Sequence, residues 1–177
     1  RVSTGTYWDG TGFTRPQPTY LAATGTTTWT LPVTPRPPDG QYRATVRATD
    51  TVGNTTSNGA LRTVTFSIDA TPPPAPTITS GPPASTAETR AELRFTSSER
   101  RVTLTCALDG GRAERCNDGD AGQGRARYRD LAPGEHCFTV FATDTAANPG
   151  PTTRYCWTVT GASLPAAINA SGGTPKA

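Results

Sequence analysis

Four cysteines carry the most definite chemistry in this 177-residue chain, and all of them fall in its second half. They are Cys106, Cys116, Cys137 and Cys156. A zinc site is one hypothesis, but no two of them have CxxC spacing and the chain has a single histidine. Two disulfides are the favoured hypothesis, and they imply an oxidising compartment.

Aspartate and asparagine recur where strand-like segments end, and their oxygens are ligands that Ca²⁺ accepts. The residues concerned are Asp50, Asn54, Asp69, Asp144 and Asn148. The same side chains also accept hydrogen bonds from turn amides, which requires no ion. We expect the turn role and no cofactor, and we keep Ca²⁺ as the alternative.

Side chains suited to catalysis or ligand binding are sparse. His136 is in phase with apolar neighbours, and no serine or cysteine is placed to use it as a base, so we expect no enzyme. Tyr7 and Trp8 form the one aromatic pair expected to be exposed, and they could line a carbohydrate-binding platform. Trp29 and Trp157 fall on strand positions where a core tryptophan is expected.

The composition favours an all-β chain and argues against nucleic-acid binding and membrane insertion. Threonine is abundant, and glycine and proline number 18 and 17, which suits strands separated by turns. The net charge is only +3 and the arginines are scattered, so no basic stripe for nucleic acid is expected. No apolar run is long enough for membrane insertion. The chain has no methionine, so we expect it to be a piece of a longer protein.

One short sequence occurs nearly twice: RATDTVGN at 47–54 returns as FATDTAAN at 141–148. The matching residues keep a constant offset of about 94, which is the length of one sandwich domain. A proline-rich stretch at 69–83 lies between the copies and predicts a short, stiff spacer. We therefore expect domains at 1–70 and 71–160, followed by a linker or tail at 161–177.

Apolar and polar residues alternate with period 2 in both copies, which predicts strands with one buried side. Tyr42, Ala44, Val46 and Ala48 share one face in the first copy, and His136, Phe138, Val140 and Ala142 share it in the second. Further strands are expected at 26–31, 91–97, 102–108 and 125–131. The second copy has AAN where the first has VGN, which weakens any requirement for a positive φ there.

These motifs resemble bacterial extracellular Ig-like tandem repeats. The first copy carries the pattern as DGQYRATVRATDTVGN and TFSIDATPP, and the second resembles a sister group through CALDGGRAERC, LAPGEHCFTVFATD and YCWTV. The resemblance covers residues 1–160 and implies two tandem Ig-like antiparallel β-sandwiches. It also implies a non-catalytic spacer, stalk or adhesive module of a secreted or surface protein.

The cysteines can be paired from their positions on these strands. Cys106 and Cys116 flank an Asp-Gly-Gly turn, so we pair them. Cys137 and Cys156 lie on successive strands and can meet as outward neighbours. A bridge between the two sheets is the third option, and the outward phase of Cys137 argues against it.

The first copy is short at its N-terminal side. Its motif aspartate comes only 49 residues after the first residue, so about two strands are expected to be missing. Either proteolysis has removed these strands, or another segment fills the gap: upstream chain, a neighbouring subunit or the SLPAAI stretch of the tail. The expected partners are therefore neighbouring domains or other copies, with glycans or a surface receptor as further possibilities. The alternative functions are a subunit of a strand-complemented polymer and an accessory carbohydrate-binding module.

Overall fold

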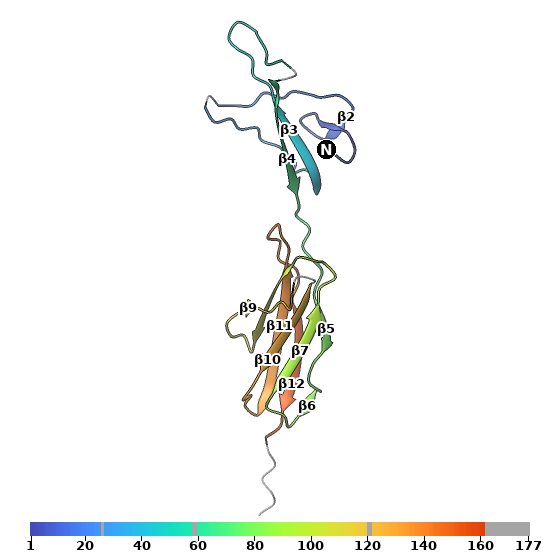
Figure 1. Ribbon diagram of the computed structural model, residues 1–177, viewed down its shortest axis with the longest axis vertical. Helices are drawn as coiled ribbons and strands as arrows, with labels where there is room; N and C mark the ends of the chain where they lie inside the picture. The colour runs from blue at the N-terminus through green and yellow to red at the C-terminus, as the bar shows by residue number, and fades with distance from the viewer. Residues whose placement is uncertain (26, 58–59, 120–121, 162–177) are drawn as a thin grey trace, which may run out of the picture. The chain divides into compact units, whose positions relative to one another are not determined.

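The computed structural model confirms an all-β chain and describes residues 1–25, 27–57, 60–119 and 122–161. The chain divides into two compact parts, unit 1 (Arg1–Thr71) and unit 2 (Pro72–Ala177) (Figure 1). The predicted tail at 161–177 lies almost wholly outside the described residues. Within the described ranges, no helix has the length and apolar character needed to cross a membrane.

Unit 2 is a β-sandwich of two sheets. Its strands are β5 (Thr77–Ser80), β6 (Ser85–Thr86), β7 (Ala91–Thr96), β8 (Thr103–Leu108), β9 (Glu114–Arg115), β10 (Gln123–Tyr128), β11 (Gly134–Thr143) and β12 (Thr153–Val159). One sheet has the order β10-β7-β5 and the other has the order β6-β12-β11-β8-β9. All neighbours pair antiparallel except β6 and β12, which pair parallel.

The strand order of unit 2 is that of an immunoglobulin-like fold. In the letter notation of that fold, the larger sheet is A′-G-F-C-C′ and the smaller sheet is A-B-E. The strands expected at 91–97, 102–108 and 125–131 correspond to β7, β8 and β10. The Ig-like part of the predicted resemblance is therefore confirmed, whereas bacterial origin and tandem repetition stay predictions.

The core of unit 2 lies between its two sheets. Phe95 of β7 and Phe138 of β11 contact across it, with ring centroids 5.3 Å apart. Other fully buried side chains of unit 2 include Leu93, Leu104, Val140, Trp157 and Val159. The predicted alternation holds along β11, where Phe138, Val140 and Ala142 are buried between more exposed residues.

Unit 1 contains two antiparallel hairpins among its described residues. They are β1 (Tyr7–Trp8) with β2 (Phe13–Arg15), and β3 (Gly40–Val46) with β4 (Arg62–Ile68). A ladder of aromatic rings joins them, running from Trp8 through Phe13 and Tyr42 to Phe66 with centroid separations of 5.0 to 5.8 Å. Tyr42 is buried by this ladder.

Two expectations for unit 1 are wrong. Tyr42 is the one buried residue on the predicted inward face of β3, because Ala44, Val46 and Ala48 are exposed. Trp29 is 54% exposed rather than buried, and its neighbour Thr30 makes only an isolated bridge to Thr24. The physical reason is the same in both cases: no second sheet covers these positions in the described part of unit 1.

The chain enters unit 2 at one end and leaves it at the other (Figure 1). At the entry end, Pro73 lies against Gly150, whose amide donates to the carbonyl of Ala142 near the end of β11. At the exit end, Val159 pairs with Gly134 at the start of β11. The 10 residues of β11 therefore separate the two ends by about 33 Å.

Candidate functional site

The four cysteines form two disulfides in unit 2. Cys106 pairs with Cys116, and Cys137 pairs with Cys156, with Cα atoms 6.1 and 4.2 Å apart. The first bridge is buried and belongs to the core, whereas the second joins residues that lie directly opposite each other on β11 and β12. These are the pairs expected from the sequence.

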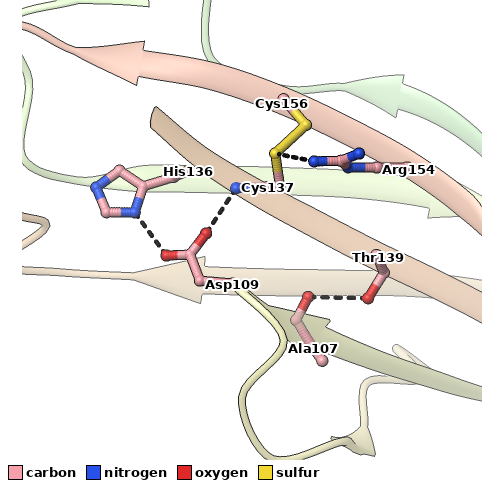
Figure 2. Close-up of a disulfide and its surroundings, with 7 residues drawn as sticks. All are labelled: Ala107, Asp109, His136, Cys137, Thr139, Arg154 and Cys156. Carbon is pink, nitrogen blue, oxygen red and sulfur yellow. Dashed lines mark hydrogen bonds and ion pairs between the residues drawn. A yellow bond between two sulfur atoms is a disulfide. The ribbon is translucent and has the colours of Figure 1, made fainter. Parts of the chain in front are cut away.

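A hydrogen-bonded pair, Asp109 and His136, lies beside the second bridge (Figure 2). Asp109 occupies the tight turn between β8 and β9 with φ +51°, and its Oδ1 accepts the amide of Cys137 at 2.7 Å. Its Oδ2 lies 2.7 Å from His136 Nδ1, and His136 Nε2 lies 2.8 Å from the carbonyl of Ala132. Both ring nitrogens face acceptors, so the imidazolium, which donates from both, fits best.

This arrangement shifts the pKa values of His136 and Asp109 so that both groups are ionised over a wider pH range. The hydrogen bond to Asp109, followed by that to Ala132, raises the pKa of His136 above its ordinary value. Desolvation opposes the ionised form of Asp109, but the Cys137 amide and His136 outweigh it and hold its pKa below the usual range. The sequence alone did not predict this pair. The signal for it was an Asp-Gly turn that returns the chain to the strand carrying His136.

The His136 pair makes the stability of unit 2 depend on pH. A raised folded-state pKa contributes stability that is complete below pH ~6.5 and disappears as pH rises through the folded value. We expect the unfolding free energy of the native chain to fall across this window, and the His136→Gln profile to be flatter. The chain has no other histidine, so the difference between the two profiles isolates this group. Parallel profiles in denaturant titrations from pH 5 to 9 would contradict the assignment.

The repeated Asp-Asn motif forms the same turn in both units. Asp50 Oδ1 accepts the amides of Val52 and Asn54, and Asp144 Oδ1 accepts those of Ala146 and Asn148, at 2.8 to 3.0 Å. In each turn Oδ2 accepts the side-chain amide of the asparagine at 2.8 Å. The asparagine side chain is the main cause that lowers the pKa of each aspartate.

One inference drawn from this motif is wrong. Ala147, which replaces the glycine of the first copy, has φ +67°, and its counterpart Gly53 has φ +91°. The second copy therefore adopts the left-handed conformation without glycine. The hydrogen bonds to Asp144 hold the loop in this conformation and offset the roughly 1–2 kcal/mol that it costs an L-residue.

Calcium binding stays an alternative to the predicted turn role. The carboxylates of Asp50 and Asp144 are engaged by turn amides, and Asp69 Oδ1 accepts the amide of Thr71 at 3.2 Å. Among the described residues, no group of three or more His, Cys, Asp or Glu side chains gathers as metal ligands would.

The two aromatic residues suggested for glycan binding differ in exposure. Tyr7 is largely exposed, whereas Trp8 is half-buried and packs on Phe13 with ring centroids 5.1 Å apart. Asp9 closes the hairpin by accepting the amides of Thr11 and Gly12, and a hydrogen bond from the Thr14 hydroxyl is the main cause that lowers its pKa. Glycan binding here stays a prediction.

The most distinctive surface of the chain is an apolar face in unit 1, which we call the open face. It consists of Ala44, Val46, Val64 and Phe66 on β3 and β4. The exposed fractions of Val46, Val64 and Phe66 are 45%, 61% and 44%. The other side of the same hairpin carries threonines, Ser67 and arginine, as expected of a solvated side. Its apolar residues are contiguous on paired strands, so the open face is a candidate interaction surface.

Unit 2 shows how such a hairpin is normally covered. The pair Tyr42 and Phe66 occupies the same register position in β3–β4 as His136 and Trp157 do in β11–β12. Trp157 is 2% exposed and Val140, the counterpart of Val46, is fully buried. The smaller sheet of unit 2 covers these positions, whereas the described residues of unit 1 supply only the β1–β2 hairpin over Tyr42.

Comparisons with known proteins give a distant likeness of fold. No family model and no curated protein matches the chain. Among solved structures, the PKD domain of an M14-like peptidase from Thermoplasmatales archaeon SCGC AB-540-F20 is 15% identical, with TM-score 0.44, over 52% of this chain and 99% of that one. The fibronectin type-III domain of human fibronectin type III domain containing protein 3 is 16% identical, with TM-score 0.31, over 54% of this chain and 90% of that one. The D00-D0 domain of intimin is 15% identical, with TM-score 0.29, over 65% of this chain and 64% of that one.

Proposed function

We propose that the chain is a non-catalytic structural module of a secreted or cell-surface protein. In this proposal unit 2 is a stiff spacer and unit 1 is the part that binds a partner. The observation that carries it is the contrast between the units. One is a cross-linked sandwich entered and left at opposite ends, and the other exposes an apolar face.

The terminal strands of unit 2 support the spacer role. β6 and β12 pair parallel near the exit, through the amides of Thr158 and Thr160 bonded to the carbonyls of Ala84 and Thr86 at 2.9 and 2.8 Å. A pull on the two chain ends loads these bonds together, because the strands shear past each other. The Cys137–Cys156 bridge additionally ties β12 to β11, the central strand of the larger sheet.

The bridge chemistry supports the proposed location. Disulfides persist in oxidising environments, and unit 2 has a small core for which two cross-links are a substantial stabilisation. Free thiols on the native chain, detected by alkylation and intact mass, would argue against secretion.

Single-molecule stretching of the whole chain tests the spacer role. We expect unit 2 to open at a higher force than unit 1, with the bridged loops of 10 and 19 residues withheld from the extension. Replacing Cys106 and Cys116 by serine should add about 35 Å to the released length, and replacing Cys137 and Cys156 should add about 65 Å. Opening of unit 2 at the lower force would overturn the proposal.

A further inference from the structure

The open face is the feature of this chain that most requires a partner. In unit 2 the equivalent hairpin has strands on both edges, since β11 pairs with β8 and β12 pairs with β6. In unit 1 the edge of β3 is partly used, because the amide of Val2 donates to the carbonyl of Gln41 at 2.9 Å. Within the described ranges, β4 pairs with β3 and with no other strand. Two exposed apolar side chains of β4, those of Val64 and Phe66, lie beside this free edge.

A segment of matching pattern lies in the tail. The sequence from Ser163 to Asn169 reads SLPAAIN, so Leu164, Ala166 and Ile168 fall on one side of an extended strand. These three residues supply the apolar side chains that the open face lacks. The segment lies outside the described residues.

Pro165 is compatible with strand addition in one direction. Side-chain direction and amide direction alternate with the same period of two along a strand. In one strand direction the amides of Leu164, Ala166 and Ile168 point to β4 while their side chains extend the open face. The missing N–H of Pro165 then lies on the outer edge, where proline is tolerated and blocks further strands.

The geometry of unit 2 favours a segment from another molecule. The tail leaves from Val159, at the end of unit 2 opposite to Pro73, and β11 separates the two ends by about 33 Å. The residues between Val159 and Leu164 reach only about 17 Å when fully extended. Leu164 therefore cannot return to the linker end of its own unit 2, whereas the tail of a second copy has no such restriction.

We propose that the Ser163–Asn169 segment of one copy adds as an edge strand to β4 of a second copy and covers its open face, which joins copies head to tail. This inference rests on the proposed role of unit 1 as the binding part and names its occupant. It is independent of the spacer role of unit 2. Single-molecule stretching tests the spacer role on one chain, whereas light scattering tests the association of two or more chains.

The test uses the full chain and measures mass against concentration by light scattering. We expect the wild-type mass to rise from that of one chain between about 10 μM and 1 mM. Leu164→Asp with Ile168→Asp removes the donor, and Val64→Asp removes the acceptor at a position too exposed to disturb folding. Each change should weaken association at least tenfold.

Two matched controls introduce the same number of charges at positions whose side chains lie on the opposite side of the strand. Ala167→Asp with Asn169→Asp alters the same tail, and Thr65→Asp alters the other side of β4. Both should associate like the wild type. A mixture of the donor-deficient and acceptor-deficient chains should form a dimer and stop there, because only one productive interface remains.

Three results would overturn the proposal. The first is a wild-type chain that stays at the mass of one molecule at about 1 mM. The second is a donor-deficient chain that associates as its charge-matched control does. The third is protection of β4 amides from hydrogen exchange that needs the tail but not a second molecule, which would show insertion within one chain.

Discussion

Reduction of both disulfides is expected to remove about 6 kcal/mol from the free energy of unfolding of unit 2. The bridges join cysteines 10 and 19 positions apart in the sequence, and loop-closure entropy gives about 3 kcal/mol for each. A domain of this size has roughly 5–15 kcal/mol in total. The reduced unit should therefore be largely unfolded at 37 °C.

Hydrogen exchange with and without a thiol reductant measures this effect and contains its own control. Unit 1 has no cysteine, so its exchange rates should not change when the bridges are reduced. The amides of β7, β8, β11 and β12 should lose their protection together. Unchanged protection of these strands after complete reduction would show that the core alone sustains unit 2.

The two double variants separate the bridges. Cys137 and Cys156 are half-buried on the outer side of the sheet, so serine at both positions reports mainly the lost cross-link. Cys106 and Cys116 are buried in the core, where serine also places hydroxyl groups in an apolar environment. The Cys106/Cys116 variant should consequently be the less stable of the two, although its loop is shorter.

The sequence predicted unit 2 well because its signals are local. Alternation along β11 and β12 determines which residues face the core, and this phase also placed Cys137 opposite Cys156. Pairing of Cys106 with Cys116 followed from the turn between them. In each case the inference needed only neighbouring residues and the period of a strand.

The wrong or missing predictions concern features that depend on contacts with other parts of the chain. Val46 and Trp29 have strand-like patterns, but burial depends on a covering sheet, and a pattern of one strand does not report whether that sheet exists. Ala147 adopts a positive φ because the side chain of Asp144 binds the loop amides, and residue type at position 147 carries no trace of this. His136 and Asp109 meet only because β8 and β11 are adjacent.

Trp157 and Phe66 occupy equivalent positions in the two units, but replacing each by alanine is expected to change the free energy of unfolding of the monomeric chain by very different amounts. Trp157→Ala should cost unit 2 about 3–5 kcal/mol, because the side chain is 2% exposed and the cavity cannot fill completely. Trp157→Phe should cost less, since it keeps a buried ring and removes an indole N–H without a partner among the described residues. Phe66→Ala should cost unit 1 only about 1 kcal/mol, since the ring is 44% exposed and stacks on Tyr42 alone within β3–β4.

The small cost of Phe66→Ala should grow when copies associate, because an added strand beside β4 would bury the ring as the smaller sheet buries Trp157. Denaturant titration of dilute chain measures the first cost, and light scattering of concentrated chain measures the second. We expect association to weaken at least tenfold in Phe66→Ala while the unfolding of the separated chain changes little. Equal association of Phe66→Ala and wild type would mean that the open face takes no part in assembly, and that its exposure in unit 1 has a different cause.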